Sequence, residues 1–344
     1  MAIKRVSIEE FVSLAASIPV FDVRSPGEFT HAHIPNAVSL PLFTDEERKN
    51  VGIAYKQKGK QEAIKIGLNY FGPKMNQIIS TVVKSHRNAP AEVLLYCWRG
   101  GMRSGGVAWL LDLYGYQVYV LNGGYKAYRN WALNTFQQQH KVRVLGGYTG
   151  SAKTAILNEL KKHQPVIDLE GIANHKGSAF GGINQPQQPT QEMFENTLAL
   201  ELSRQKEAFW VEDESQRIGR LNVPNGFWET MRSAPVYFID VPFEERLEHI
   251  IFGYGLLDAD KMIEAVLRIQ KRFGPLETKT TIAFLQEGNI REAFAVLLKY
   301  YDKQYSKSLQ NRKNLEALLQ KISVPKIDIA HNTNTLINAT KEQL

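Results

Sequence analysis

The sequence predicts an α/β protein of two domains, the second of which ends in a mostly helical part. Short apolar segments typical of buried strands alternate with helical patterns along most of the 344 residues. Two of these segments lead into glycine-rich loops and then a helix start, one at Cys97 and one at Lys153. A polar stretch at 137–140 separates the halves, so we expect domains over residues 1–136 and 141–344.

The composition is that of a globular protein with an excess of basic residues. Hydrophobic residues make up 43% of the chain, and no segment approaches the ~20 apolar residues of a membrane helix. A net charge of +7 suggests an anionic partner without identifying it. The chain has a single cysteine, Cys97, which excludes an internal disulfide and a Cys-rich zinc site. The N-terminal segment has an amphipathic pattern that includes Glu9 and Glu10, which is not the pattern of a signal peptide. We therefore expect a cytoplasmic protein with no membrane partner.

In the first half, strands are expected at 18–23, 92–96 and 117–121, and helices at 105–114 and 125–136. The segment 48–65 interrupts this pattern and carries six basic residues against the single acid Glu62. Two interpretations remain open for it: a solvated helix and loop, or a contact with a phosphate backbone. The candidate RNA-binding residues are Lys56, Lys58 and Lys60.

Cys97 begins the first glycine-rich loop, at the end of an apolar strand. The residues that follow it are Trp98, Arg99, Gly100, Gly101, Met102, Arg103 and Ser104. Backbone N–H groups of such a loop can surround one anion, and the helix start adds partial positive charge. Arg99 and Arg103 should lower the pKa of the thiol and favour a nucleophile, although a buried structural cysteine is the commoner role of a lone Cys. The spacing Cys97-x5-Arg103 is also that of a cysteine phosphatase.

The second glycine-rich loop joins a strand at 142–145 to a helix at 155–163. It follows the P-loop pattern except that Ala152 stands in place of glycine. Such a loop can hold a diphosphate, with Lys153 on the terminal phosphates and Thr154 on Mg²⁺. The expected diphosphate-binding residues are Gly147, Gly150, Ser151, Lys153 and Thr154.

Further strands are expected at 165–170, 209–214, 235–240 and 323–330, with a mostly helical stretch at 243–321. Carboxylates stand at strand ends, on the side where P-loop domains bind ligand, and we expect one of them to orient Mg²⁺ indirectly. They are Asp168, Glu170, Glu212 and Asp213. The glycine-rich segment 171–182 is too long for a plain connection, so we expect it to be functional.

The first half resembles a rhodanese domain. The resemblance is carried by Asp22-Val23-Arg24, Glu28-Phe29, His33-Ile34-Pro35, the Cys97 loop and the Leu121–Tyr125 turn, with Ala32 and Asn36 in place of two glycines. It implies an α/β domain whose cysteine carries sulfur or selenium from a donor to an acceptor. Asp22, Arg24 and His33 are expected to have structural roles, because buried charges of this kind usually brace a loop.

Taken together, the two halves resemble the tRNA 2-selenouridine synthase family over nearly the whole chain. The specific motifs are the segment from Cys97 to Ser104 and the segment from Asp168 to Gly181. The resemblance implies that sulfur of 2-thiouridine at the tRNA wobble position is replaced by selenium from selenophosphate. It also implies an S-geranylated intermediate made from geranyl diphosphate, with Cys97 as the nucleophile and selanyl carrier and with no tightly bound cofactor. A monomer is the simplest expectation.

Three other functions remain open at this stage. The chain could be a cysteine-dependent sulfurtransferase or phosphatase fused to a P-loop kinase. It could be a P-loop kinase with a regulatory rhodanese module. It could also be a non-catalytic tRNA-binding module, which only the basic charge supports.

Overall fold

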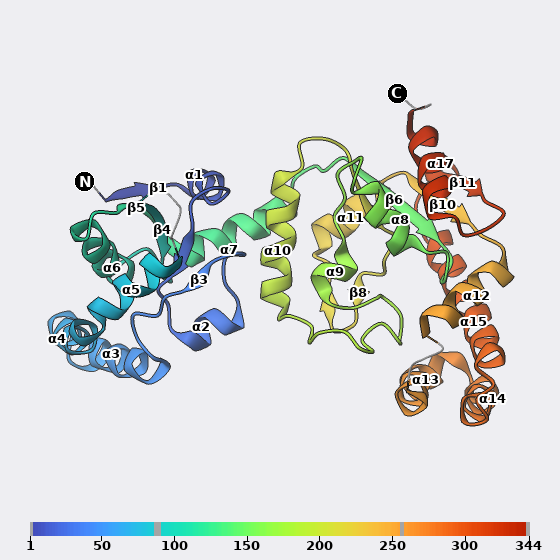
Figure 1. The fold of residues 1–344 in the computed structure, drawn as a ribbon, viewed down its shortest axis with the longest axis horizontal. Helices are drawn as coiled ribbons and strands as arrows, with labels where there is room; N and C mark the ends of the chain where they lie inside the picture. The colour runs from blue at the N-terminus through green and yellow to red at the C-terminus, as the bar shows by residue number, and fades with distance from the viewer. Residues whose placement is uncertain (1–2, 86–90, 255–257, 342–344) are drawn as a thin grey trace. The chain divides into compact units, whose positions relative to one another are not determined.

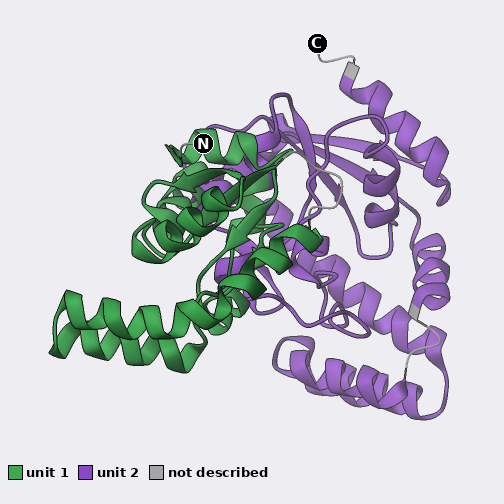
Figure 2. Cartoon of the chain, turned by 60° about the vertical axis from the view of Figure 1, so that its left-hand side comes forward, with its two compact units in different colours: residues 1–135, 195–200 green, residues 136–194, 201–344 purple. Residues whose placement is uncertain are grey.

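The computed structural model describes residues 3–85, 91–254 and 258–341 (Figure 1). The chain forms two compact units, shown in different colours in Figure 2. Unit 1 comprises residues 1–135 and 195–200, and unit 2 comprises residues 136–194 and 201–344. The predicted α/β fold class, with a mostly helical C-terminal part, is confirmed.

Unit 1 is built on a five-stranded sheet in the order β1-β5-β4-β2-β3, and every pair of neighbours is parallel. The strands are β1 Lys4–Val6, β2 Val20–Asp22, β3 Val38–Ser39, β4 Glu92–Tyr96 and β5 Gln117–Leu121. Strands β4 and β5 are buried almost along their whole length, which explains their continuous apolar sequences.

Helices cover both faces of this sheet. Val93 and Leu95 pack into the cluster formed with α6, while Tyr96 meets Phe11 of α1 at a ring separation of 6.3 Å. The alternation along β4 therefore directs successive side chains to opposite helical layers. The helices of unit 1 are α1 Ile8–Leu14, α2 Pro26–His31, α3 Asp45–Gln57, α4 Lys60–Phe71, η1 Gly72–Lys74, α5 Met75–Ser85, α6 Met102–Leu113 and α7 Gly124–Thr135.

Unit 2 contains a four-stranded parallel sheet in the order β11-β10-β6-β7. Its strands are β6 Val142–Gly147, β7 Phe209–Glu212, β10 Val236–Asp240 and β11 Leu319–Ser323. A separate antiparallel pair consists of β8 Arg217–Ile218 and β9 Leu221–Asn222. Because β6 is central in the four-stranded sheet, the loop that follows it opens at the carboxyl edge between two neighbouring strands.

Helices α8 and α17 pack together on this sheet, and the C-terminal helices from α12 to α15 form a second apolar cluster. The helices of unit 2 are α8 Lys153–Leu160, α9 Leu169–Ala173, α10 Gln191–Arg204, α11 Asn225–Ser233, α12 Phe243–Tyr254, α13 Ala259–Phe273, α14 Pro275–Gln286, α15 Ile290–Gln310, α16 Leu315–Leu318 and α17 Ile329–Lys341. The middle of α10, residues 195–200, belongs to unit 1.

Two predicted strands are wrong. The segment 165–170 forms only an isolated bridge between Val166 and Trp210, because the Asp168 side chain accepts a hydrogen bond from Gly171 and begins helix α9. The last strand lies at Leu319–Ser323 rather than at 323–330, and a helix follows it from Ile329. The helix predicted from Gly105 begins three residues earlier, at Met102.

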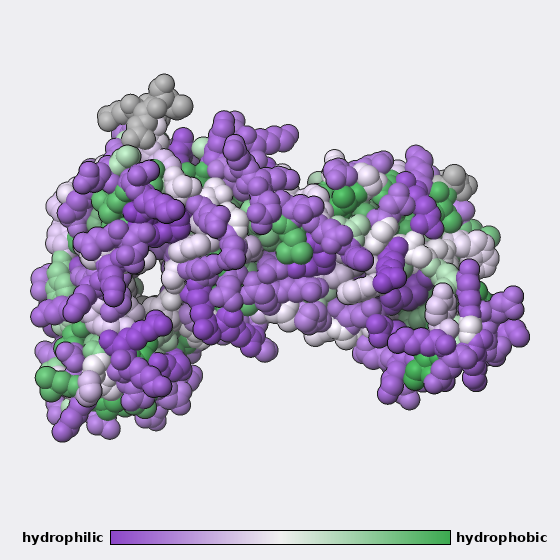
Figure 3. Space-filling model, turned by 180° about the vertical axis from the view of Figure 1, so that it is seen from behind, coloured by the Kyte–Doolittle hydropathy of each residue, from purple (hydrophilic) through white to green (hydrophobic). Residues whose placement is uncertain are grey.

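The face of the chain drawn in Figure 3 is mostly hydrophilic, and hydrophobic residues are scattered over it. Among the residues that the structure describes, no helix has the length and apolar character needed to cross a bilayer.

Candidate functional site

The Cys97 loop packs directly against the turn that joins β5 to α7. Gly100 has a φ of +64°, and a Cβ there would lie 2.4 Å from the carbonyl oxygen of Leu121. Gly124, on the other side of the contact, has a φ of +60°, and its Cβ would lie 2.3 Å from the Cys97 oxygen. Only glycine fits both positions, and the Tyr125 N–H donates to the Cys97 oxygen at 2.8 Å. The start of α7 therefore fixes the backbone at Cys97.

The thiol of Cys97 is nearly enclosed, with 3% of the residue exposed. Its Sγ lies 3.3 Å from the hydroxyl of Ser104, on the first turn of α6. Burial raises the pKa of the thiol, but hydrogen bonds from Ser104 and from the Arg99 N–H, together with the charge of Arg103, lower it below its usual value. The direction of this pKa shift agrees with the prediction, but the largest contribution that lowers the pKa comes from Ser104 rather than from the charges of the two arginines. A lowered pKa favours the thiolate.

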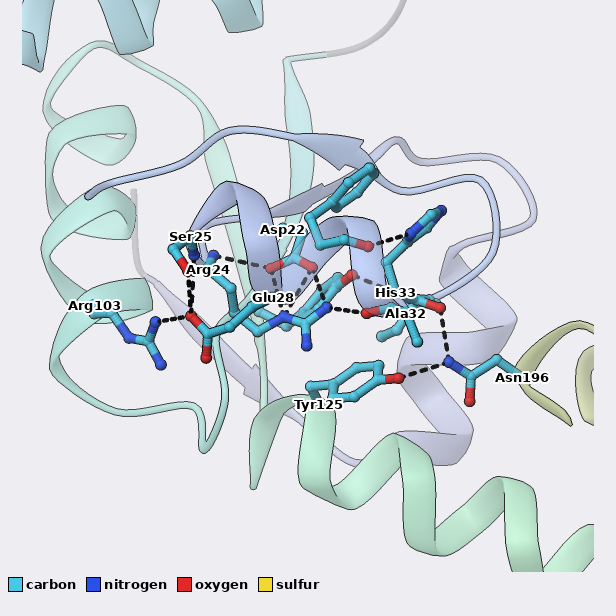
Figure 4. Close-up of polar contacts among 12 residues, drawn as sticks. Asp22, Arg24, Ser25, Glu28, Ala32, His33, Arg103, Tyr125 and Asn196 are labelled. Carbon is cyan, nitrogen blue, oxygen red and sulfur yellow. Dashed lines mark hydrogen bonds and ion pairs between the residues drawn. The ribbon is translucent and has the colours of Figure 1, made fainter. Parts of the chain in front are cut away.

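The two arginines of the loop have different surroundings. Arg103 donates to Oε2 of Glu28 at 2.8 Å, and the same oxygen accepts from the Ser25 N–H at 3.0 Å (Figure 4). Arg48 also approaches this carboxylate, at 3.1 Å. Arg103 therefore acts on the thiol by its charge while its guanidinium is held by Glu28. Arg99 is exposed to solvent.

The remaining residues of the loop are of two kinds, buried and exposed. Ser104 and Gly100 are buried beneath the loop, whereas Gly101 and Met102 are exposed. Gly101 is the N-cap of α6, so Met102 stands on the first helical turn beside the loop. Of the residues predicted for the selenium-donor loop, Ser104 contacts the sulfur directly, at 3.3 Å, whereas Gly101 and Met102 are open to solvent.

Asp22 and Arg24 form a buried ion pair at 2.6 Å beneath the loop (Figure 4). The Arg24 guanidinium also donates to the Ala32 oxygen at 2.6 Å and lies 3.9 Å from the centre of the Tyr125 ring. His33 stacks on Phe29 with its ring centre 3.9 Å away. These contacts satisfy the side chains within the protein, so their roles are structural.

A residue that the sequence analysis missed completes this network. Asn196, on the part of α10 that belongs to unit 1, donates to the His33 oxygen at 2.9 Å and to the Tyr125 hydroxyl at 2.8 Å (Figure 4). Its own Oδ1 accepts from Arg129 at 2.6 Å. No sequence signal marked Asn196, because an isolated asparagine in an amphipathic helix usually faces solvent.

The P-loop of unit 2 has the backbone of a phosphate cradle. Gly147 and Gly150 have φ values of +152° and +85°, and a Cβ on either would collide with its surroundings. Ala152 adopts the left-handed conformation, with φ 59°, just before α8. The left-handed conformation costs a residue with a Cβ roughly 1 kcal/mol. The surrounding loop, rather than the preference of alanine, therefore determines the backbone conformation at this position. Ser151 is buried, and its hydroxyl is without a hydrogen-bond partner among the described residues.

Lys153 and Thr154 occupy the first two positions of α8. Lys153 Nζ donates to the Gly147 oxygen at 2.7 Å, so its ammonium lies over the loop. Thr154 Oγ1 donates to Glu170 at 3.1 Å. The two side chains predicted for the terminal phosphates and for Mg²⁺ are therefore adjacent to an acidic cluster.

That cluster consists of Glu170, Glu212 and Glu214, with Asp168 nearby. Burial, reinforced by the charges of Asp168 and Glu170, raises the pKa of Glu212 to about 8. Burial also raises the pKa of Glu170 and of Glu214, although Lys153 opposes the rise at both. One oxygen of Glu212 is buried without a hydrogen-bond partner in the described part of the chain. Glu212 therefore keeps its proton at neutral pH, because ionisation of the whole cluster would place more negative charge there than Lys153 compensates.

The set of carboxylates near the P-loop differs from the predicted one at Asp213 and at Glu214. Asp213 does not join the cluster, because it accepts from the Tyr305 hydroxyl at 2.6 Å and from Arg312 at 2.5 Å. Glu214 does join it, and its place two residues beyond the end of β7 was the signal available in the sequence. Within the described ranges, no group of three or more His, Cys, Asp or Glu residues has the geometry of a metal site.

The segment 48–65 forms most of a helical hairpin, in which α3 and α4 lie side by side (Figures 1 and 2). Lys56 lies in the last turn of α3, Lys58 ends that helix and Lys60 begins α4. All three are exposed. Neither open interpretation of this segment is decided by its geometry, although the exposed charges are accessible to an anionic partner.

Comparisons with known proteins agree with this architecture. The profile of the rhodanese-like domain matches residues 7–130, and that of the tRNA 2-selenouridine synthase AAA domain matches residues 140–271. The chain is similar to the tRNA 2-selenouridine synthase of Nitrosomonas europaea, with 36% identity over 84% of this chain and 76% of that protein. It is also similar to that of Bdellovibrio bacteriovorus, with 34% identity over 91% of this chain and 94% of the other.

Among solved structures, the chain is similar to the N-terminal domain of a putative ATP/GTP binding protein from Clostridium difficile 630. The identity is 41%, the match covers 38% of this chain and 99% of that one, and the TM-score is 0.35.

A rhodanese domain with a buried, activated cysteine, followed on the same chain by a P-loop domain, defines a class of two-domain transferases. The relatives just described match most of this chain, so the similarity extends over both domains. The chain belongs to the tRNA 2-selenouridine synthase family.

Proposed function

We propose that this protein replaces sulfur by selenium in 2-thiouridine at the wobble position of tRNA. Selenophosphate is the selenium donor in this proposal, and geranyl diphosphate supplies a geranyl group to the sulfur before it leaves. The observation that carries the proposal is the presence, on one chain, of a buried thiol with a lowered pKa and of a P-loop with an adjacent lysine. Membership of the tRNA 2-selenouridine synthase family supports the RNA substrate.

In the first step, the sulfur of the base attacks C1 of the geranyl group. The C1–S bond forms while the C1–O bond breaks, and pyrophosphate leaves with the electron pair. The base loses its N3 proton to solvent. This step needs no nucleophile from the protein, but it needs stabilisation of the departing diphosphate, which the backbone N–H groups of the P-loop and Lys153 are suited to give.

The residues beside the P-loop fit Mg²⁺ as a companion of the diphosphate. Thr154 Oγ1 and the Glu170 carboxylate are hard oxygen ligands 3.1 Å apart, and Mg²⁺ typically uses one or two such ligands together with phosphate oxygens. Burial raises the pKa of Glu170, and a nearby cation would stabilise the ionised form of this carboxylate. When bound, Mg²⁺ supplies additional positive charge for the leaving pyrophosphate.

In the second step, Cys97 carries selenium to C2 of the base as a Cys97 S–Se–H group. Loading this group from selenophosphate oxidises the selenium by two electrons, which a small-molecule disulfide accepts, while the phosphoryl group leaves to water as phosphate. The terminal selenium then attacks C2, the C2–Se bond forms as the C2–S bond breaks, and geranylthiol leaves. A small-molecule thiol reduces the remaining S–Se bond, which restores the Cys97 thiol and leaves 2-selenouridine.

Geranylation makes the sulfur a better leaving group. A geranylthiolate carries one negative charge, whereas unalkylated sulfur would have to leave C2 as sulfide. The chain has one cysteine, so no second thiol of this protein can resolve an adduct on Cys97. The selenium must therefore pass to another acceptor, which agrees with delivery to RNA.

Replacement of Cys97 by alanine separates the two steps. The Cys97→Ala variant should lose selenation and retain geranylation, so S-geranyl-2-thiouridine should accumulate in the tRNA. Mass spectrometry of wobble nucleosides, after incubation with thiolated tRNA and each donor, measures both products. Retained geranylation also shows that the variant is folded. Normal formation of 2-selenouridine by Cys97→Ala would exclude covalent catalysis by this residue.

The alternatives make different predictions. A phosphatase in unit 1 would release phosphate from aryl phosphates, but the guanidinium of Arg103, which such chemistry needs for the anion, is held by Glu28. A kinase in unit 2 would turn over ATP. A binding module would keep full activity in cells after loss of Cys97. None of these is supported by an observation as specific as an activated thiol on the same chain as a P-loop domain.

A further inference from the structure

Trp98 directly follows Cys97 and has an indole ring that is partly open to solvent. The residue is 40% exposed, whereas Cys97 is 3% exposed. The other aromatic residues of the network beneath the loop, Tyr96, Tyr125 and Tyr128, are fully buried. A single exposed apolar residue needs no explanation by itself, but this large ring stands beside a buried thiol that a substrate has to approach.

The protein holds the ring of Trp98 in place. It lies 5.7 Å from the ring of Tyr125, centre to centre, with an angle of 41° between the two planes. The Arg24 guanidinium lies 5.9 Å from the centre of the indole. The carbonyl oxygen of Trp98 accepts a hydrogen bond from the Lys126 N–H at 3.1 Å. These contacts orient the indole before a ligand binds, which lowers the entropic cost of recognition.

The chemistry at Cys97 brings the substrate base close to this ring. Transfer of selenium requires C2 of the base to lie about 3–3.5 Å from the attacking atom. Trp98 is the next residue along the chain, and its Cα lies about 3.8 Å from that of Cys97. A pyrimidine that is placed for the reaction therefore lies within reach of the exposed indole.

Stacking on aromatic rings is a common way in which proteins hold the bases of single-stranded RNA loops. The wobble base belongs to such a loop. Every base has a π face, so one indole can accept 2-thiouridine, its S-alkylated form and 2-selenouridine in turn. Arg99, the residue after Trp98, is also exposed, and a guanidinium there can contact a phosphate next to a stacked base.

We propose that Trp98 is the surface on which the wobble base of the tRNA stacks, with Arg99 on an adjacent phosphate. The inference rests on the proposed function, since it assigns the RNA base to the Cys97 loop. It adds a residue that positions the substrate, and it explains why a tryptophan is exposed next to an enclosed thiol.

Trp98→Leu and Trp98→Phe distinguish an aromatic surface from a merely apolar one. The substrate is tRNA with S-geranyl-2-thiouridine, supplied with selenophosphate, a small-molecule disulfide and a small-molecule thiol. Trp98→Leu should lower kcat/KM for 2-selenouridine formation roughly 5- to 150-fold, the range for loss of one base–aromatic stack. Trp98→Phe should lose less than about fivefold, because its ring still stacks. Trp109→Leu, at an exposed tryptophan of α6, is the matched control and should behave like the unchanged protein.

Alkylation of Cys97 by iodoacetamide shows whether the loop is intact in these variants. Its pH profile should be the same in all of them, because the groups that lower the pKa of Cys97 do not include the Trp98 side chain. A shifted profile in Trp98→Leu would mean that the residue supports the loop, and the inference would be wrong. A full rate of 2-selenouridine formation in Trp98→Leu, or equal losses in Trp98→Leu and Trp98→Phe, would overturn it as well.

Tryptophan emission reports the contact itself. The chain has five tryptophans, so the contribution of Trp98 is the difference between the unchanged protein and Trp98→Phe. Thiolated tRNA should quench the unchanged protein more than Trp98→Phe, and equal quenching would mean that the base does not lie on the indole. If the unchanged protein forms no 2-selenouridine, the proposed function fails and the inference fails with it.

Discussion

The Sγ atom of Cys97 lies 3.3 Å from the hydroxyl oxygen of Ser104, which in turn lies 3.2 Å from the carbonyl oxygen of Gly101. The hydroxyl has one proton, so it can donate either to the carbonyl or to the sulfur. Once the thiol ionises, donation to the negatively charged sulfur is stronger than donation to a neutral carbonyl. The Ser104 hydroxyl can thus turn its proton toward the sulfur when Cys97 ionises.

Replacement of Ser104 by alanine should raise the pKa of Cys97, because it removes one of the hydrogen bonds that lower this pKa. The rate of alkylation by iodoacetamide at pH 7 should fall about tenfold or more, because a hydrogen bond to a charged group contributes about 1.5–3 kcal/mol. The pH dependence of alkylation measures the effect, since the chain has a single thiol. Ser85→Ala, at an exposed serine of α5, serves as the control. An unchanged pH profile in Ser104→Ala would mean that the loop backbone and Arg103, and not Ser104, lower the pKa of Cys97.

Lys153 is expected to contribute directly to diphosphate binding. Its ammonium lies 2.7 Å from the Gly147 oxygen and can exchange this neutral acceptor for phosphate oxygens. Lys153→Ala should weaken pyrophosphate binding by about 1.5–3 kcal/mol and abolish geranyl transfer, since the contact also stabilises the leaving group. Lys161→Ala, at the exposed end of α8, is the control. Normal geranylation by Lys153→Ala, or a strict requirement for ATP, would contradict this role.

The acidic cluster should make the stability of the protein depend on pH. Because the pKa of Glu212 is raised from 4.5 to about 8, the folded state retains a proton that the unfolded state releases over that range. The free energy of unfolding should therefore decrease as the pH rises from about 4.5 to 8, by roughly 1.4 kcal/mol for each unit of pKa shift at most. Thermal unfolding at about pH 6 and about pH 8.5, on either side of the raised pKa, measures this decrease.

Glu212→Gln should unfold with a smaller dependence on pH, because the amide has no proton to lose. Glu245→Gln, at an exposed position of α12, should behave like the unchanged protein. Mg²⁺ with pyrophosphate should raise the unfolding temperature more at the higher pH than at the lower one, since the cation compensates the ionised carboxylates. The same pH dependence in Glu212→Gln as in the unchanged protein would assign the effect to other groups.

The sequence predicted the two glycine-rich loops more accurately than the elements around them. Strand β4 and strand β5 were predicted at their observed bounds, because fully buried parallel strands have continuous apolar sequences. The segment 165–170 has the same apolar character, but Asp168 caps a helix there and overrides the strand pattern. A local pattern cannot show which of two competing hydrogen-bond arrangements the rest of the fold favours.

The surroundings of the sites depend on contacts between residues far apart in the sequence. The pairing of Arg103 with Glu28 spans 75 positions, and that of Asn196 with Tyr125 spans 71. The Gly147 N–H of the P-loop donates to the Tyr305 hydroxyl of α15, 158 positions later. Residue type and spacing could identify Cys97 and Lys153, but not the partners that tune them.

The helical hairpin offers the most direct test of the RNA contact. The segment 48–65 has six basic residues and one acid, and Glu62 is already paired with Lys65 at 3.5 Å. Arg48 approaches Glu28. Four exposed lysines remain: Lys49 lies early in α3, whereas Lys56, Lys58 and Lys60 lie near the hairpin turn. If they bind phosphates, each such ion pair releases counterions on binding, and the affinity then falls steeply with salt.

Replacement of Lys56, Lys58 and Lys60 by glutamine should weaken tRNA binding at low salt and flatten the plot of log affinity against log salt concentration. The slope should decrease by roughly 0.7–0.9 for each phosphate that is no longer neutralised, so by up to about 2.5 for the three. The matched control replaces three exposed lysines of α13 and α14, Lys261, Lys271 and Lys279. Fluorescence anisotropy with labelled tRNA between about 50 and 200 mM salt, a range over which such slopes are measurable, gives both values. An unchanged slope in the hairpin variant, together with a reduced slope in the control, would place the RNA contact on the C-terminal helices instead.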